Sequence, residues 1–223
     1  MQDFKQAAKN GQRDFFVTLR QIEKMHTMEL KEHFAGRIFS LISETADELG
    51  LECYVVGGYV RDIFLNRPSK DIDVVVVGSG IEMAQAFGKK LGRGAHVSVF
   101  KNFGTAQVKF KDTEVEFVGA RKESYSHDSR KPIVEDGTLE DDQNRRDFTI
   151  NAMAYSPKTG IIDVFGGMED LERRVIRCVG SARERFGEDA LRILRAVRFR
   201  HSLDLPLIRR RRKQSGKWRS GWS

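Results

Sequence analysis

The 223-residue sequence has little cysteine, and its two residues of this type, Cys53 and Cys178, are far apart. Two such cysteines exclude a disulfide framework, and they do not have the spacing of a zinc site. Long apolar runs are also missing, so no segment reaches the about 20 residues that a membrane-spanning helix needs. The N-terminal residues contain no apolar stretch typical of a signal peptide. We therefore expect no membrane partner and a reducing, cytoplasmic location.

Positive charge is present in excess, but the excess is confined to the C-terminal end. The formal net charge is +7, and seven of the 39 Lys and Arg residues lie after Ile208, where no acidic residue occurs. The first 208 residues therefore contain equal numbers of basic and acidic side chains. The high pI describes a tail, and it does not by itself indicate a nucleic-acid-binding body.

The composition and the apolar periodicity together predict a globular α/β chain. Hydrophobic residues make up 39% and charged residues 32%, enough for one sizeable core. Residues 30–49 have apolar side chains at three- and four-residue steps, as in an amphipathic helix, and Gly50 follows at a favoured helix end. Further on, β-branched runs alternate with shorter helical patterns. The expected strands are 53–56, 71–77, 96–100, 105–111 and 113–118, with helices at 59–65 and 81–91.

A long helix is predicted in the middle of the chain. Thr138 and Asp141 have the spacing of a capping pair, and the helix is expected to continue through Ala154. The neighbouring segments are a loop at 124–137 and short strands at 161–165 and 175–179.

A second long helix is predicted over 181–200, where Ser181 and Glu184 have capping-box spacing. Its apolar side, which is expected to face the core, is formed by Leu191, Leu194 and Val197. The predicted fold class is α/β, a mixed sheet with flanking helices, followed by the start of an all-α region.

The first candidate site is the acidic pair that begins the predicted strand 71–77. Side chains two residues apart in a strand point to the same face, so Asp71 and Asp73 project together. Two carboxylates on one rigid face suit Mg²⁺, which prefers oxygen ligands, and Mg²⁺ assists phosphoryl chemistry. The alternative is a solvent-facing strand start with two charged residues.

A glycine turn precedes this pair. Gly57 and Gly58 follow one predicted strand and precede a short helix, where backbone N–H groups can approach phosphate oxygens. The turn therefore favours a phosphate-binding role for the region around the two carboxylates.

Two later blocks concentrate arginine, acidic and amide side chains. The block at 145–154 places Asp147 and Asn151 one helical turn apart. A second block repeats charged side chains every three residues, at Asp189, Arg192, Arg195 and Arg198. A salt-bridged helix surface and an amphipathic helix with an arginine-rich face are the alternative interpretations.

These motifs together resemble the class II tRNA nucleotidyltransferase and bacterial poly(A) polymerase family of the DNA polymerase β superfamily. The resemblance extends from Leu30 to Arg200 and depends on Val56-Gly-Gly-Tyr-Val-Arg-Asp62, Asp71-Ile-Asp73, the block at 145–154 and Glu188-Asp-Ala-Leu-Arg192. It implies a polymerase β-like head, Mg²⁺ as cofactor, and CTP, ATP and the 3′ end of tRNA as partners.

The resemblance also implies catalytic roles. Asp71 and Asp73 would hold the metal ions. Glu116 would be the third carboxylate, or else part of a polar strand face with Glu114.

Nucleotide binding is implied for a larger set. Gly58, Arg61 and Arg146 would contact the triphosphate, and Arg suits phosphate oxygens because its fork is planar. Asp147 and Asn151 would order the sugar and a loop. The edge of the base would be bound by Asp189 and Arg192, since a carboxylate accepts from an exocyclic amino group and a guanidinium donates to ring acceptors, with Arg195 and Arg198 extending that surface.

The resemblance implies an N-terminal extension (1–29), a head (30–180) and the start of a helical neck (181–200), and the composition predicts a basic, disordered tail (201–223). Family members continue into body and tail domains that hold tRNA, and these are expected to be absent, which leaves the grip on tRNA incomplete. The implied function is CCA addition to tRNA. A poly(A) polymerase or A-adding enzyme, and a non-catalytic nucleotide-binding remnant, are the alternatives.

Overall fold

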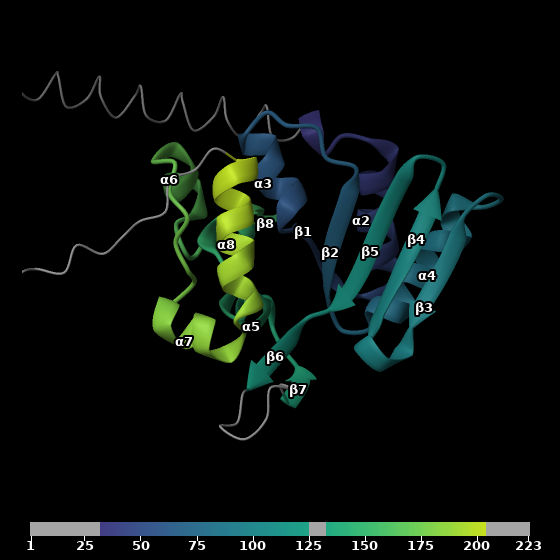
Figure 1. Ribbon diagram of the computed structural model, residues 1–223. Coiled ribbons are helices and arrows are strands. Elements are labelled where there is room, and N and C mark those ends of the chain that lie inside the picture. The colour runs from purple at the N-terminus through teal and green to yellow at the C-terminus, as the bar shows by residue number, and fades with distance from the viewer. Residues whose placement is uncertain (1–31, 125–132, 204–223) are drawn as a thin grey trace, which may run out of the picture.

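The computed structural model describes residues 32–124 and 133–203. The predicted extension at 1–29 and most of the tail at 201–223 lie outside these residues. The central element is a seven-stranded sheet (Figure 1). Its strands in chain order are β1 (Glu52–Val56), β2 (Asp71–Val77), β3 (His96–Phe100), β4 (Thr105–Phe110), β5 (Thr113–Gly119), β8 (Ala154–Ser156) and β9 (Gly160–Ile162).

The strand order in this sheet is β3-β4-β5-β2-β1-β8-β9. Strands β2 and β5 are parallel, and the other neighbouring pairs are antiparallel. A separate hairpin is formed by β6 (Arg121–Ser124) and β7 (Ile133–Asp136). The mixed α/β fold predicted from the sequence is confirmed.

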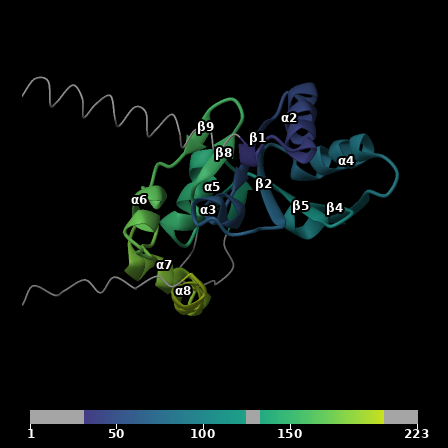
Figure 2. The ribbon, with the colours of Figure 1, turned by 90° about the horizontal axis from the view of Figure 1, so that it is seen from above.

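Helices lie on both sides of the sheet. Helices α2 (Arg37–Leu49) and α4 (Gly80–Leu91) pack together on one face, and α8 (Leu191–Ser202) lies on the side away from them (Figure 2). The remaining helices are α3 (Gly58–Phe64), α5 (Leu139–Asn144), α6 (Gly167–Glu172) and α7 (Ala182–Glu188), with 3-10 turns η1 (Lys101–Phe103) and η2 (Thr149–Asn151). No helix among the described residues is long and apolar enough to cross a membrane.

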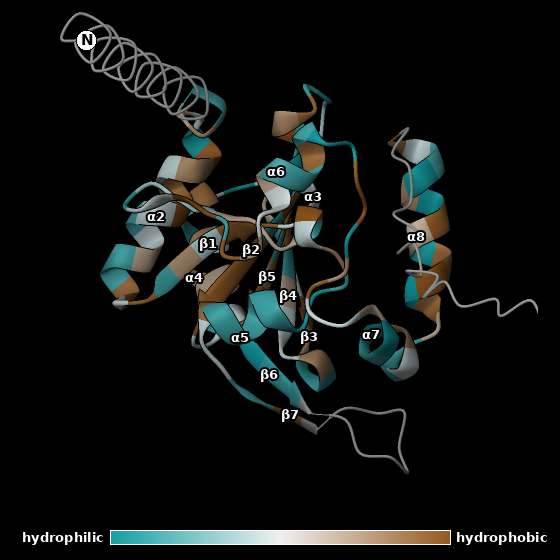
Figure 3. Cartoon of the chain, turned by 90° about the vertical axis from the view of Figure 1, so that its left-hand side faces the viewer, coloured by the Kyte–Doolittle hydropathy of each residue, from teal (hydrophilic) through white to brown (hydrophobic). Residues whose placement is uncertain are grey.

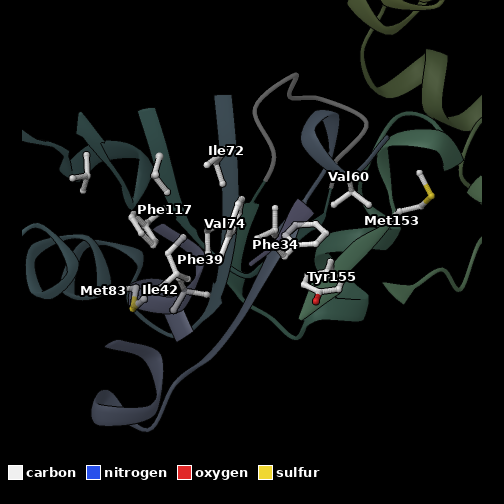
Figure 4. Close-up of a cluster of buried hydrophobic side chains, with 14 of the residues drawn as sticks. Phe34, Phe39, Ile42, Val60, Ile72, Val74, Met83, Phe117, Met153 and Tyr155 are labelled. Carbon is white, nitrogen blue, oxygen red and sulfur yellow. The ribbon is translucent and has the colours of Figure 1, made fainter. Parts of the chain in front are cut away.

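Strand β2 is at the centre of the core, and its sequence explains why. Val74 and Val76 are fully buried in the main apolar cluster, where Phe117 and Met83 also lie (Figure 4). Val75 is buried on the opposite face, in a smaller cluster. A strand buried on both faces requires a continuous apolar run rather than an alternating one, and each such valine contributes about 1.5–3 kcal/mol. The prediction of a strand at 71–77 is confirmed, with the same bounds.

The predicted continuous helix at 30–49 is wrong in its first turns. Glu32 and His33 are helical, but the backbone leaves the helix at residues 34–36 and α2 starts at Arg37, while residues 30 and 31 lie outside the described ranges. Gly36 has an extended backbone before the helix, and Phe34 lies outside it. The Phe34 ring stacks on Tyr155 with ring centres 3.7 Å apart and packs edge-on against Phe39. Aromatic packing across the fold therefore overrides the local helical periodicity.

The predicted helix over 138–154 was wrong beyond its first turns. Thr138 and Asp141 form the predicted capping box, but α5 ends at Asn144. Phe148 then takes an extended conformation and forms a bridge with Cys178. Ala154, the last residue of the predicted helix, instead begins β8 and pairs with Val56 of β1.

Three smaller predictions also need correction. The predicted loop at 124–137 contains β7, which pairs with β6. The predicted strand at 175–179 reduces to isolated bridging residues, because the segment opposite it turns into η2 directly after the bridge. The predicted strand at 161–165 is shorter and shifted, since β9 covers Gly160–Ile162.

The predicted helix over 181–200 is broken at Asp189, which separates α7 from α8. Asp189 has an extended backbone, and its Oδ1 accepts a hydrogen bond from the Leu191 N–H at 2.9 Å. This contact satisfies a backbone donor at the start of α8 that a continuous helix would have bonded internally. Ser181 precedes α7 but makes no side-chain capping bond, so the predicted capping box there is wrong.

The side of α8 that faces the fold was also predicted wrongly. Leu191, Leu194 and Val197 are 63%, 66% and 55% exposed, and apolar colour is visible along the helix in Figure 3. Arg192, Ala196 and Phe199 are buried instead. The arginine faces inward because it has polar partners there, described below, and the apolar stripe points outward.

This orientation predicts unequal effects for two glutamine substitutions on α8. Leu194→Gln should change the free energy of unfolding by no more than about 0.5 kcal/mol, because the side chain is already in solvent. Ala196→Gln should cost about 1–3 kcal/mol, since it forces a larger polar group into a buried position. Urea unfolding of both variants measures the difference. A larger loss in Leu194→Gln than in Ala196→Gln would contradict the observed orientation.

Candidate nucleotide-binding site

The sheet brings three distant segments to one edge. Because β1 and β2 are antiparallel, the end of β1 lies beside the start of β2, and Val56 pairs with Asp73. Val56 also pairs with Ala154 at the start of β8. The glycine turn after β1, the acidic pair of β2 and the segment that precedes β8 are therefore neighbours.

A pocket of about 460 Å³ lies at this edge. This volume is within the range of small-molecule sites. Four of the predicted residues line it from α3 and β2, namely Gly58, Arg61, Asp71 and Asp73. Three more come from the segment before β8, namely Arg146, Asp147 and Asn151.

The region around α7 and α8 closes the pocket from the other side. It contributes the remaining predicted nucleotide-binding residues, Asp189, Arg192, Arg195 and Arg198. Side chains more than 130 positions apart in the chain thus line one pocket. Glu116 is the one predicted site residue that is not among those lining it.

Asp73 is the more buried of the two strand carboxylates, whereas Asp71 is exposed. Desolvation by burial raises the pKa of Asp73 to about 6, opposed by the positive charge of Arg146 and reinforced by Glu116 and Asp71. Burial disfavours the charged form of a carboxyl group. The site therefore holds an ionised Asp73 at neutral pH at some cost to the fold.

Glu116 lies on β5, where it pairs in register with Asp73 across the parallel strands. Its charge contributes to the raised pKa of Asp73. Within residues 32–124 and 133–203, no group of three or more His, Cys, Asp or Glu side chains is arranged to hold a metal ion. Two carboxylates at a pocket still fit Mg²⁺, which commonly takes one or two protein carboxylates together with substrate phosphates.

Gly57 is required at the turn by its conformation and its neighbours. Its φ is +73°, a region that side-chain-bearing residues rarely adopt. A Cβ on this residue would lie 3.2 Å from Arg146 Nη1 and 3.4 Å from Asp73 Oδ2. The glycine therefore lets the backbone pass between a pocket arginine and a pocket carboxylate.

A chain of hydrogen bonds links α3, η2 and α8. Arg61 Nη1 donates to Asn151 Oδ1 at 2.6 Å, and Asn151 Nδ2 donates to Asp147 Oδ1 at 3.3 Å. Arg195 Nε donates to the other carboxylate oxygen, Asp147 Oδ2, at 2.6 Å. Asp147 and Asn151 are thus close together as predicted, although an irregular segment and not a helix connects them.

Arg146 is oriented by the carboxylate of Asp142, which is not among the predicted site residues. Asp142 Oδ2 accepts from Arg146 Nε at 3.0 Å and from Nη2 at 2.8 Å. Asp142 Oδ1 accepts from Arg145 through Nε at 2.9 Å and through Nη2. The Asp142 side chain is fully buried, so one carboxylate holds two adjacent arginines.

Arg192 is held in a similar way at the start of α8. Its Nη1 donates to Glu188 Oε2 at 2.7 Å, and its Nη2 donates to the Arg145 carbonyl at 3.2 Å. Glu188 also pairs with Arg185 at 3.0 Å. These contacts explain why a charged side chain faces inward on α8.

Sequence reasoning missed the residues that position the arginines. They share one property, which is contact with an arginine of the pocket. The helical spacing of Asp142 from Arg146 and of Glu188 from Arg192, four residues in each pair, was a usable signal. No local signal marked Phe199, because its partners include a distant helix. The missed set comprises Asp62, Asp142, Glu188 and Phe199.

The fold and the pocket together are those of a nucleotidyltransferase head domain. The poly A polymerase head domain matches residues 53–177, more than half of the chain. The chain belongs to this family.

The curated relatives are longer proteins. A CCA-adding enzyme of Lactobacillus delbrueckii subsp. bulgaricus is 40% identical over 174 residues, which cover 77% of this chain and 42% of the relative. An A-adding tRNA nucleotidyltransferase of Aquifex aeolicus is 44% identical over 163 residues, which cover 71% of this chain and 19% of the relative. The chain thus spans less than half the length of these relatives.

Solved structures agree with the sequence relatives. A tRNA nucleotidyltransferase complexed with a primer tRNA and an incoming ATP analogue is 41% identical, with a TM-score of 0.65 over 75% of this chain and 46% of that one. The apo form II of a CCA-adding enzyme is 35% identical, with a TM-score of 0.69 over 81% of this chain and 41% of that one. The predicted family and fold class are therefore confirmed.

Proposed function

We propose that this chain is the catalytic head of a template-independent RNA nucleotidyltransferase that adds CMP and AMP from CTP and ATP to the 3′ end of tRNA. The observation that supports this function best is the convergence of two strand carboxylates and arginines from α3, the segment before β8 and α8 on one pocket. The names of the sequence relatives support tRNA as the acceptor. The acceptor hydroxyl attacks the α-phosphate, and pyrophosphate leaves.

The residues of the chain position the reactants and stabilise charge. Gly58, Arg61 and Arg146 bind the triphosphate, and the two charged forks neutralise the leaving pyrophosphate. Asp147 and Asn151 order the sugar. Catalysis of this kind depends mostly on positioning.

Base selection is assigned to the start of α8 and the residue before it. The Asp189 carboxylate accepts from the exocyclic amino group shared by cytosine and adenine, and Arg192 donates to ring acceptors. Arg195 and Arg198 extend this surface. Asp189 lies at the break between α7 and α8, and Arg192 lies in the first turn of α8. Both side chains line the pocket, which supports the assignment.

We also propose a divalent metal, Mg²⁺, held by Asp71 and Asp73, with Glu116 as the third carboxylate. A metal ion held there would supply activation of the attacking hydroxyl and neutralisation of phosphate charge. The placement of the two aspartates in the pocket, and of Glu116 beside Asp73 in the sheet, supports the proposal.

The domain assignment and the location are also proposals. We assign residues 30–180 to the head and 181–200 to the start of a neck. Two observations support a domain boundary in this part of the chain. The helical segment is broken at Asp189, and α8 lies on the side of the sheet away from α2 and α4 (Figure 2). A cytoplasmic location is supported by the two cysteines, which are both free.

A-only addition is a second candidate, because a relative with this activity is 44% identical. Incubation with Mg²⁺, labelled CTP and ATP separates the possibilities. Incorporation of two CMP and one AMP into tRNA lacking CCA indicates CCA addition, whereas AMP added only to tRNA ending in CC indicates A-only addition. Long A tails would indicate a poly(A) polymerase. Nucleotide binding without incorporation would indicate a non-catalytic remnant and overturn the proposed activity.

Arg192→Ala should weaken binding of CTP and ATP about 10- to 100-fold, the range expected for a good bidentate base contact. The change also removes the contacts of a buried side chain with Glu188 and the Arg145 carbonyl, so the titrations are made below the melting transition of each variant, where only folded protein is compared. Isothermal titration measures the affinity, and Arg183→Ala, an exposed arginine of α7, is the matched control. Equal affinity in Arg192→Ala and the control would remove Arg192 from the base-binding role.

A further inference from the structure

Three arginines of the pocket surround one aromatic ring. The guanidinium carbons of Arg61, Arg195 and Arg198 lie 5.2, 5.3 and 5.5 Å from the centre of the Phe199 ring. These distances are within the about 6 Å at which a cation is attracted to a ring face. Phe199 itself lines the pocket and is only 6% exposed.

The ring joins two parts of the fold. Arg195 and Arg198 come from α8, the helix of Phe199, whereas Arg61 comes from α3. The Phe199 ring also packs edge-on against the ring of Phe148, with ring centres 5.9 Å apart and ring planes at 88°. Phe199 therefore fixes α8 against the head and also touches the arginines of both.

The ring acts together with the polar contacts of these arginines. Arg61 is held by Asp62 and Asn151, and Arg195 is held by Asp147. For Arg198, the structure records no ion pair within the described residues. The ring is thus the common contact of three like charges, one of which has no carboxylate partner in the described part of the chain.

We propose that Phe199 is a positioning residue for nucleotide binding, which holds Arg61, Arg195 and Arg198 in the pocket through its ring. The inference depends on the proposed function, since these arginines are assigned to the nucleotide there. Phe199 acts through Arg61, Arg195 and Arg198, and its recorded cation contacts do not include Arg192, the arginine assigned to the base edge. Its loss should therefore weaken CTP and ATP binding to the same extent.

The test compares Phe199→Leu with Phe148→Leu. Both substitutions remove one ring of the same aromatic pair and keep an apolar side chain, but the structure records a stacked arginine only for Phe199 among the described residues. Titration of the full chain with CTP and with ATP in Mg²⁺ should show about tenfold weaker binding for Phe199→Leu, the size expected for a loss of cation–π contacts. Phe148→Leu should bind like the parent. Phe199→Tyr, which keeps an aromatic ring at this position, should retain most of the affinity of the parent for both nucleotides.

Thermal unfolding separates positioning from folding. Titrations are made below the melting transition of each variant, so that only folded protein is compared. Parent-like affinity in Phe199→Leu, or an equal loss in Phe148→Leu, would overturn the inference and leave the proposed function intact. A parent protein that binds neither nucleotide would instead overturn the proposed function, and with it the nucleotide role of Phe199.

Discussion

Replacing Asp73 by asparagine is expected to abolish nucleotide transfer and, at the same time, to stabilise the metal-free protein. The activity is lost because asparagine removes a charged oxygen ligand of the proposed metal. The fold gains because burial raises the pKa of Asp73 from 3.8 to about 6, which shows that the ionised form is unfavourable in the folded state. At neutral pH the gain should be about 1–3 kcal/mol, with the full shift as the upper limit.

The pH dependence of this gain has a defined sign. Since the pKa of Asp73 is higher in the folded than in the unfolded state, its contribution to stability is complete below about pH 3.8 and is lost as pH rises through about 6. The asparagine side chain cannot ionise, so Asp73→Asn and the parent should be similar near pH 4. The variant should become progressively more stable than the parent between pH 4 and 6, with a constant difference above about pH 7.

Urea unfolding from pH 4 to pH 8 without metal measures this difference, and Asp71→Asn is the matched control. Asp71 is exposed, so its substitution should change stability by less than about 0.5 kcal/mol at any of these pH values. Added Mg²⁺ should raise the Tm of the parent and not that of Asp73→Asn, because a ligand stabilises only the state that binds it. Retained transfer activity in Asp73→Asn would remove it from the metal site, and a loss of stability at pH 7 would contradict the burial argument.

Sequence patterns predict well those parts of the fold whose structure is determined by residues close together in the chain. Strand β2 has the predicted bounds because a run of valines buried on both faces admits no other placement in a sheet. The acidic pair at its start was identified for the same reason, since the two-residue period of a strand fixes the common face. The capping box at Thr138 is local as well, and it forms as predicted.

The parts predicted poorly are determined by contacts between distant segments. The segment from Arg145 to Asn151 has helical spacing, but Asp142 and the bridge of Phe148 to Cys178 hold it in an irregular path. On α8, apolar spacing predicts that Leu194 faces inward, yet Arg192 does so. No pattern within the helix indicates that Glu188 and the carbonyl of Arg145 are available as its partners.

Most of the residues of the candidate site were nevertheless predicted from the sequence, because they fall in several motifs that together resemble those of one family. Of the twelve residues predicted for it, only Glu116 does not line the pocket. The residues that were not predicted contact the arginines of the pocket and orient them, as Asp142 and Glu188 do by accepting hydrogen bonds from Arg146 and Arg192. Their importance follows from burial and geometry, as Asp142 illustrates.

Asp142→Ala is expected to destabilise the protein by about 3–5 kcal/mol, the largest stability loss predicted for this chain. The substitution removes a fully buried carboxylate and leaves the guanidinium groups of Arg145 and Arg146, which are 17% and 18% exposed, without it. Arg145 keeps a contact to Glu123, whereas Arg146 keeps only the Asn151 carbonyl at 3.2 Å among its recorded partners in the described residues. The cost therefore arises mainly from the loss of both hydrogen bonds to a carboxylate by the partly buried Arg146, which keeps only the longer-range attraction of Asp73.

This reasoning predicts that a second substitution should recover part of the loss. In Asp142→Ala combined with Arg146→Ala, the stranded charge is gone, so the double variant should lose less than the sum of the single losses. Asp141→Ala is the matched control, because its carboxylate belongs to the exposed capping box and its removal should cost only about 1 kcal/mol. Urea unfolding of the four variants measures all terms. Strict additivity, or an equal loss in Asp141→Ala and Asp142→Ala, would show that the carboxylate does not hold Arg146, and the orientation of that arginine in the pocket would need another cause.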